Sequence, residues 1–269
     1  MSRLQPTTKE FLASSDETVE KEFFERVFLH NRSVKTTYAR RLDDLNQVAF
    51  RHIADIKETP VKIMDVAMSS GISTVEWRDQ LAANKIDFDL TGTDLTIDAE
   101  LHSYAKFGLL FDRRGNLLHF DCFGKGWPPH QGEMRLFYLH QLLTTSVIRC
   151  ASALGGKIEK TPVKLLSRGL ANNGHFRAIE DDLAAANPPA FKRAFHVIRA
   201  ANILNLAYFA ESTLRTMLTT LKERLKDGGL LLVCRTDGTT NHGTVFKLSS
   251  SRLVAVERLG SGSEIEPLV

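Results

Sequence analysis

Residues 61–74, VKIMDVAMSSGIST, constrain this chain more than any other stretch because they join two hydrophobic patterns. The first part is a short β-like run that ends at Asp65, and the last part opens a helical pattern near Ser73. Small residues fill the junction between them: Ala67, Ser69 and Gly71. A loop of small residues before a helix N-terminus lets backbone N–H groups approach a ligand rich in acceptors. The stretch therefore predicts a nucleotide-type pocket.

The composition predicts a folded globular protein with a sizeable core. The 269 residues are 43% hydrophobic and 25% charged, with a formal net charge of +3. This balance of charges does not predict a nucleic-acid partner. The three cysteines are far apart, so we expect neither a disulfide framework nor a zinc site, and a cytoplasmic location fits best. No leader-like segment and no run of about 18 apolar residues is present, so we expect no membrane partner.

Two amphipathic patterns before Pro60 predict an N-terminal helical cap over residues 1–60. The first pattern places these apolar residues on one face: Val19, Phe23, Phe24, Val27 and Phe28. That face could form a lid over a hydrophobic substrate, but simple packing on the main domain is the favoured interpretation.

A second strand is predicted over residues 87–96, DFDLTGTDLT, with Asp94 at its end. A carboxylate that closes the second strand of a strand–loop–helix–strand unit can accept hydrogen bonds from ribose hydroxyls. Alone, Asp94 would be interpreted as a turn or helix cap. The small-residue loop before it favours the ribose role.

An insertion is predicted over residues 97–132, with a β-hairpin at 108–121. The Gly- and Pro-rich loop after the hairpin carries His130, a candidate general base because histidine titrates near neutral pH. An ordinary surface connection is the alternative for this loop. His119, Asp121 and Cys122 lack a second pair at ligand spacing, so no metal site is predicted.

Residues 61–96 resemble the start of a class I S-adenosylmethionine-dependent methyltransferase. In that family an acidic residue ends the first strand, a G-x-G-x-G-like loop follows, and an acidic residue at the end of the second strand holds the ribose. The matching positions in this chain are Asp65, then Ala67, Ser69 and Gly71, then Asp94. Only the last of the three loop positions is glycine. A dinucleotide fingerprint fits the loop worse, which disfavours a nicotinamide-dependent oxidoreductase.

Two later segments follow the family order. FRAIEDDL, residues 176–183, resembles the third strand, after which an acid meets the adenine amino group. Asp181 or Asp182 can take this role, with Asp182 preferred and helix capping as the alternative. FHVIRAANILNLAYF, residues 195–209, is similar to the fourth-strand segment of the family, most closely in its chemotaxis-receptor branch. This likeness implies that Asn202 lies beside cofactor and substrate, although Asn202 could also cap a turn.

The resemblance implies an α/β fold with a Rossmann-like, seven-stranded, mostly parallel sheet and helices on both faces over residues 61–269, plus the cap and the hairpin insertion. It implies S-adenosylmethionine as cofactor and methyl transfer by direct displacement. A hydrophobic pocket under the Phe-rich cap would favour a small-molecule acceptor, hydrophobic or acyl-like, and a homodimer is left open. His130 is preferred as base over His119 and His242. A methyltransferase acting on a protein side chain and a non-catalytic cofactor-binding sensor or scaffold are the alternatives.

Overall fold

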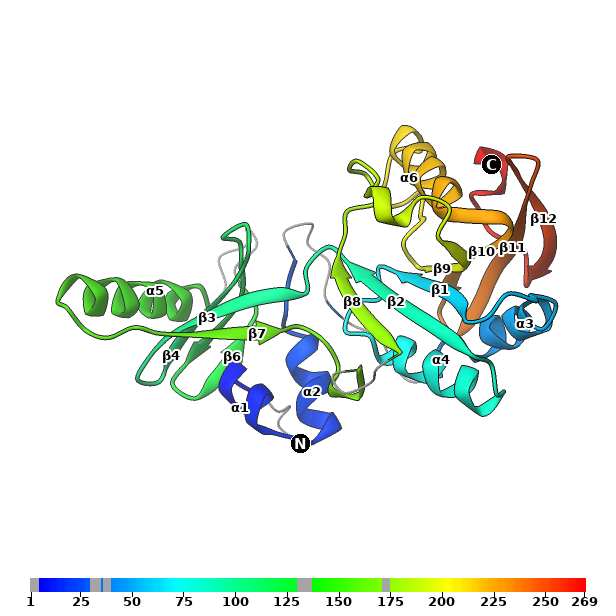
Figure 1. The fold of residues 1–269 in the computed structure, drawn as a ribbon. Helices are drawn as coiled ribbons and strands as arrows, with labels where there is room; N and C mark the ends of the chain where they lie inside the picture. Colours follow the sequence, from blue (N-terminus) through cyan, green and yellow to red (C-terminus); the bar gives the residue numbers. More distant parts are fainter. Residues whose placement is uncertain (1–4, 30–34, 36–39, 130–136, 171–174) are drawn as a thin grey trace. The chain divides into compact units, whose positions relative to one another are not determined.

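The computed structural model describes residues 5–29, 35, 40–129, 137–170 and 175–269, which form two compact units. Unit 1 comprises residues 1–36 and 96–168, and unit 2 comprises residues 37–95 and 169–269. Within the described ranges, no helix combines the length and the apolar character needed to cross a bilayer. Figure 1 labels the elements of both units.

Unit 2 is built on a seven-stranded sheet. From edge to edge its strands are β8 (Phe176–Glu180), β2 (Phe88–Asp94), β1 (Val61–Val66), β9 (Phe195–Ala201), β10 (Leu225–Asp237), β11 (Thr240–Ser249) and β12 (Arg252–Leu259). The five strands from β8 to β10 are mutually parallel, whereas β11 runs antiparallel to both β10 and β12. The predicted α/β class is confirmed, with a sheet that is mixed.

The order of the parallel strands defines where a ligand can bind. Numbered along the chain within unit 2, they lie in the order 3-2-1-4-5, as in doubly wound folds. The order reverses between β1 and β9, which pair directly from Ile63 to Val66. In such sheets ligands bind outside the carboxyl ends of the strands at this reversal.

Helices cover both faces of the unit 2 sheet (Figure 1). They are α3 (Asp43–Ile53), α4 (Ile72–Ala83) and α6 (Glu211–Arg224). Leu45 of α3 and Trp77 of α4 pack with Ile63 and Val197 on one face. On the other face, Leu214 of α6 packs with Met64 of β1 and Ile198 of β9. Alternate strand residues thus enter separate cores, and both faces of the central strands are buried.

Unit 1 is built on a five-stranded antiparallel sheet. Its strands, in spatial order, are β6 (Lys125–Trp127), β5 (Leu117–Cys122), β4 (Phe107–Asp112), β3 (Asp98–Tyr104) and β7 (Glu159–Lys164). The helices of the unit are α1 (Thr8–Ala13), α2 (Glu17–Phe24) and α5 (Phe137–Ala153). The described residues of the two units also form short 3-10 helices, at Arg168–Leu170, Pro189–Phe191 and Glu266–Leu268.

The two faces of the unit 1 sheet carry different helices. Phe11 of α1 and Phe23 of α2 pack with Leu101 and Leu118 on one face. Ile148 of α5 packs with Phe120 on the other. The phenylalanines of the N-terminal helices are therefore core residues and do not form a lid, but they pack in unit 1 and not on the sheet of the main domain, unit 2.

The N-terminal helices are divided between the units. Elements α1 and α2 belong to unit 1, whereas α3 belongs to unit 2. The predicted hairpin at 108–121 is present as β4 and β5, but it forms part of a larger sheet because β3 pairs with both β4 and β7.

Candidate functional site

The loop between β1 and α4 adopts a backbone that glycine normally supplies. Ala67, Ser69 and Gly71 have positive φ angles of 54°, 60° and 84°. These are the three positions that match the glycines of the G-x-G-x-G-like loop. A left-handed conformation costs a non-glycine residue about 1–2 kcal/mol, so the surrounding structure must hold Ala67 and Ser69 in place. Gly71 itself is the N-cap of α4, without a side-chain cap.

Hydrogen bonds tie this loop to the end of β2. The N–H of Met68 donates to the carbonyl of Thr93 at 3.0 Å. The N–H of Ser69 donates to Oδ2 of Asp94 at 2.7 Å. Asp94 is buried, with 6% of its surface exposed. The loop and the carboxylate at the end of β2 therefore form one connected structure.

Beneath the loop, Asp65 forms a buried ion pair with Arg199 of β9. The guanidinium donates to both carboxylate oxygens, at 2.9 Å from Nε and 2.6 Å from Nη2. Thr74 of α4 donates a third hydrogen bond to Asp65 at 2.7 Å. Arg199 is fully buried, and its Cζ lies 4.1 Å from the centroid of the Trp77 ring. The oxygens of Asp65 are thus engaged by protein donors at the strand end.

The remaining donors of Arg199 bind the two helices that flank the loop. Nη1 donates to Oδ1 of Asn46 in α3 at 2.8 Å, and Nη2 donates to the carbonyl of Ser73 in α4 at 3.1 Å. Sequence reasoning assigned no such role to Arg199 or Asn46. The available signal was an arginine inside an otherwise apolar strand, FHVIRAA. A buried arginine requires an anionic partner, because an unpaired buried charge is strongly unfavourable.

The two acids that follow β8 have different partners. Arg224 of α6 donates to both carboxylate oxygens of Asp181, at 2.6 and 3.0 Å. Asp182 is half-buried and accepts a hydrogen bond from the N–H of Ala184 at 3.0 Å. Asp181 is thus held by a buried ion pair, whereas Asp182 has a local turn contact.

Asn202 follows β9 in a left-handed conformation, with φ of 61°. Its N–H donates to the carbonyl of Cys234 at 2.7 Å, and its Oδ1 accepts from the N–H of Thr236 at 2.8 Å. Asn202 therefore links the ends of β9 and β10. Burial raises the pKa of the neighbouring Cys234 thiol to about 12, so this thiol stays protonated at neutral pH.

The structure brings most of the predicted residues to one edge of the unit 2 sheet. The residues that end or follow β1, β2, β8 and β9 are Asp65, Ala67, Ser69, Gly71, Asp94, Asp181, Asp182 and Asn202. His130 lies outside the described residues. His119 is fully buried in unit 1, and His242 lies in β11, where its Nδ1 contacts Ser261.

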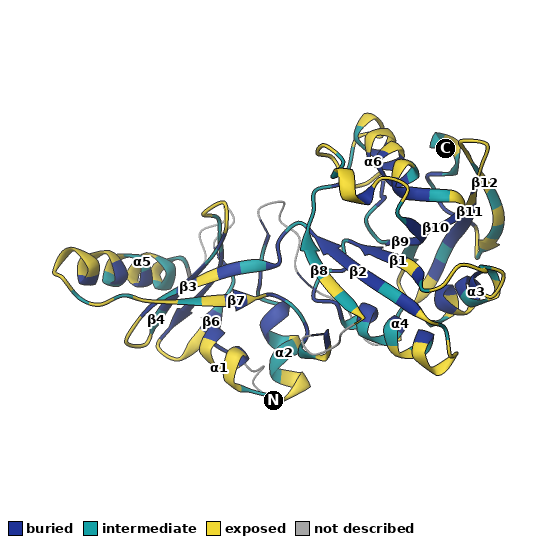
Figure 2. Ribbon diagram, viewed as in Figure 1, coloured by how far each residue is buried: buried dark blue, intermediate teal, exposed yellow. Residues whose placement is uncertain are grey.

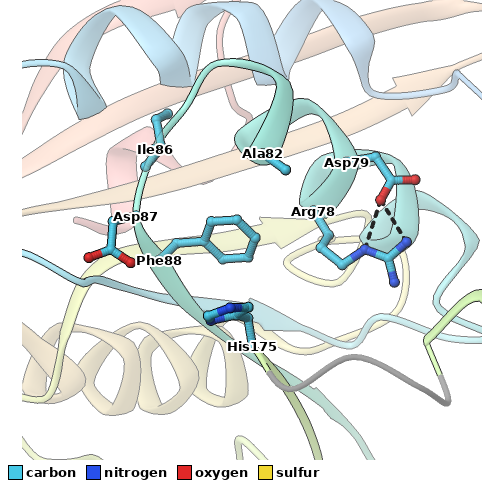
Figure 3. Close-up of a pocket in the computed structure, with 7 residues that line it drawn as sticks. All are labelled: Arg78, Asp79, Ala82, Ile86, Asp87, Phe88 and His175. Atoms are coloured by element: carbon cyan, nitrogen blue, oxygen red, sulfur yellow. Dashed lines mark hydrogen bonds and ion pairs between the residues drawn. The ribbon is translucent and has the colours of Figure 1, made fainter.

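A cavity of about 230 Å³ opens at the other end of the same sheet (Figure 3). Its walls are Arg78, Asp79, Ala82, Ile86, Asp87, Phe88 and His175. Phe88 is the first residue of β2, whereas Asp94 is the last. The cavity therefore lies at the amino end of β2 and is separate from the edge that carries the predicted residues.

The groups at the carboxyl edge of the unit 2 sheet can be compared with what S-adenosylmethionine, the cofactor that the resemblance implies, requires. The fit is good at Asp94, a strand-end carboxylate that suits ribose hydroxyls, and at the loop, whose left-handed residues turn the backbone. Ser70 Oγ is buried and makes no hydrogen bond to any described group. Asp65 fits a direct contact less well, because Arg199 and Thr74 occupy its oxygens.

No protein-family model matches the sequence. No curated protein matches it either. Similar solved structures include the citrinin polyketide synthase CMeT domain, at 12% identity and a TM-score of 0.40, covering 84% of this chain and 41% of that one. The CurJ carbon methyltransferase has 12% identity and a TM-score of 0.38, covering 73% and 35%. PH0226 from Pyrococcus horikoshii OT3 has 11% identity and a TM-score of 0.37, covering 90% and 83%.

This chain spans less than half the length of the first two of these structures. Another similar structure is the DszA carbon methyltransferase, also at low identity and low TM-score. At these scores the likeness does not itself assign an activity.

Proposed function

We propose that unit 2 binds S-adenosylmethionine at the carboxyl edge of its sheet and that the protein transfers the methyl group to a small-molecule acceptor. The observation that carries this proposal is the left-handed conformation of Ala67, Ser69 and Gly71, together with the bond from Ser69 to Asp94. Left-handed non-glycine residues also occur in ordinary turns of this chain, such as Lys85, but here two of them and Gly71 follow one another at a strand–helix junction and are tied to a strand-end carboxylate.

Each predicted residue has a proposed role that follows from its contacts. Asp94 accepts hydrogen bonds from the ribose, and the 67–71 loop lies against the methionine part. The N–H groups of Met68, Ser69 and Gly71 already donate within the protein, so those of Ala67 and Ser70 are the loop donors proposed for the ligand. Asp182 meets the adenine end, because both oxygens of Asp181 already accept from Arg224. Asn202 shapes the edge beside them through its bonds to β10.

Asp65 acts on the cofactor through the loop. Its ion pair with Arg199 joins β1 to β9, and Arg199 in turn binds both α3 and α4. This arrangement holds the start of the loop in one position, and a rigid first shell reduces the entropic cost of binding.

The bound cofactor would supply an electrophilic methyl group on a sulfonium. The protein would orient the acceptor in line with that methyl group and exclude water. If the acceptor is a hydroxyl, a base must also remove its proton, and His130 is proposed for this step. The acceptor is proposed to be a small molecule, hydrophobic or acyl-like.

Calorimetry on an Asp94 variant tests the proposal. Asp94→Ala should weaken S-adenosylhomocysteine binding at least tenfold, because a hydrogen bond to a charged group contributes roughly 1.5–3 kcal/mol. Asp89→Ala is the matched control, since Asp89 lies in the same strand toward its amino end. Affinity unchanged in Asp94→Ala, or lowered equally in both variants, would contradict the role of Asp94.

A further inference from the structure

Unit 1 has an uneven distribution of exposed apolar side chains. Apart from Leu12 of α1, those described gather on α5, on the connection that follows it, and on two turns of the sheet: Leu139, Leu142, Leu143, Leu154, Tyr104 and Phe123. Figure 2 shows the outer side of α5 as largely exposed. Phe123 and Leu154 are the most prominent of the loop positions, at 61% and 86% exposure. Such clustering on one part of a folded unit marks an interaction surface.

The turns lie at one end of the sheet. Tyr104 pairs with Phe107 across the first turn, and Phe107 pairs with Cys122, which begins the second turn. The connection at 154–158 leads into β7 at the same end, because Glu159 pairs with Ser103. Residues 104–107, 122–125 and 154–158 are therefore neighbouring connections, called here the turn surface.

The turn surface faces the side of the sheet that carries α5. Phe107 packs against the core beneath α5, and the Phe123 ring contacts the Phe107 ring at 5.1 Å. Side chains alternate along β3, where Leu101 faces the opposite core, so Tyr104 shares the side of α5. The exposed leucines of α5 continue this apolar surface.

Each connection of the turn surface carries an exposed lysine as well as its exposed apolar residue. The lysines are Lys106, Lys125 and Lys157, and α5 adds the exposed Arg149. Residues 104–107, 122–125 and 137–158 contain no aspartate or glutamate. The acidic residues of the N-terminal helices lie in the layer on the other face of the sheet: Glu10, Glu17, Glu20 and Glu22. The α5 side of the sheet also carries Asp98 and Glu100, but these lie on β3 and pair with Lys164 and Lys160 of β7, so the turn surface itself is basic and apolar.

We infer that the turn surface and the outer face of α5 bind the surface of a bilayer that contains anionic phospholipids. Aromatic and leucine side chains can enter the headgroup boundary while lysines bind the anionic headgroups. A second copy of this chain fits worse. A two-fold interface would bring the basic residues of this surface against the basic residues of the second copy, and no acidic residue of this surface could pair with them.

This inference departs from the expectation of no membrane partner, which rested on the lack of a spanning segment. Peripheral binding requires no such segment.

Sedimentation of the full chain with vesicles tests the inference. The protein should bind vesicles containing phosphatidylglycerol, bind less as salt is raised, and bind phosphatidylcholine vesicles weakly. Failure to bind the anionic vesicles would overturn the inference.

Two variants locate the contact. Lys106→Gln/Lys125→Gln/Lys157→Gln should lower the partition coefficient at least about tenfold, since each lysine near an anionic surface contributes a severalfold gain. Phe123→Ser/Leu154→Ser should also lower it, by removing the apolar part of the contact.

Matched controls come from exposed residues of unit 2. Lys85→Gln/Lys192→Gln/Lys247→Gln makes the same change of charge, and Tyr208→Ser/Val254→Ser removes comparable exposed apolar groups. Both controls should retain vesicle binding, with circular dichroism confirming that all variants fold. Equal losses in variants and controls would overturn the inference. So would sedimentation velocity showing that Phe123→Ser/Leu154→Ser converts a dimer to a monomer without changing vesicle binding.

Discussion

Arg199 places a full charge in the most buried part of unit 2. It is held there by Asp65, Asn46 and the carbonyl of Ser73, and it stacks on Trp77. Burying two opposite charges brings little net stability, because desolvation offsets their attraction. The pair gives the strand ends one defined arrangement, which is what a cofactor loop requires. We therefore regard Arg199 as a positioning residue.

A double-mutant cycle measures this pair. Arg199→Met should lower the free energy of unfolding by about 3–5 kcal/mol, because it leaves the buried Asp65 carboxylate unpaired. The double variant Arg199→Met/Asp65→Asn should be less destabilised than the sum of the single variants. Urea unfolding gives all three values. Arg215→Ala is the control, because its exposed pair with Glu211 contributes only about 0.3–0.5 kcal/mol.

If Arg199→Met cost no more than Arg215→Ala, the pair would not organise the strand ends.

At the residue scale the sequence predicted positions better than partners. Asp65 and Asp94 lie at strand ends as predicted, because strand patterns and small-residue loops are local signals. Arg199 is 134 residues from Asp65 along the chain, and no local pattern specifies such a pairing. For the same reason the ion pair of Asp181 with Arg224 was not predicted.

At the scale of elements, the β1–α4 loop keeps a left-handed backbone at two positions that are not glycine, Ala67 and Ser69. Met68 belongs to the loop, and its sulfur packs so closely on Gly92 of β2 that a Cβ there would collide with it. Together with the bonds to Thr93 and Asp94, this packing holds the loop in its left-handed turns.

Ala67→Gly tests this account of the loop. Glycine relieves about 1–2 kcal/mol of strain at φ of 54° but loses about 0.5–1 kcal/mol more conformational entropy on folding, so stability should stay unchanged or rise by up to about 1.5 kcal/mol. Ala82→Gly, in the exposed part of α4, should cost about 1 kcal/mol because no strain is relieved there. Thermal unfolding compares the two. Equal destabilisation would show that Ala67 is not strained.

Elements with strong local patterns were predicted well. Examples are α4, β2 and the hairpin of β4 and β5. The sheet of unit 1 was not predicted, because it depends on β3 pairing with β7 far along the chain. Alternation marks a strand and its faces but does not identify the neighbouring strand.

At the scale of the whole molecule, unit 1 is assembled from the N-terminus and from an insertion between β2 and β8 of unit 2. Each unit has its own hydrophobic cores. Cofactor binding is proposed in unit 2 and membrane contact in unit 1, so the two proposals can be tested separately on the intact chain.

Hydrogen exchange should separate the units. Saturating S-adenosylhomocysteine, at about 100 times its Kd, stabilises the unit that binds it by roughly 2.7 kcal/mol. Exchange should therefore slow in β1, β2 and β9, whereas β3, β4 and β5 should exchange as in the free protein. Slower exchange confined to unit 1 would place the ligand elsewhere.

Calorimetric titration of the intact protein with S-adenosylmethionine, S-adenosylhomocysteine and NAD tests whether unit 2 binds the proposed cofactor. We expect one saturable site for each of the two sulfur ligands and no binding of NAD. Absence of binding by both sulfur ligands, or binding of NAD alone, would contradict the proposal.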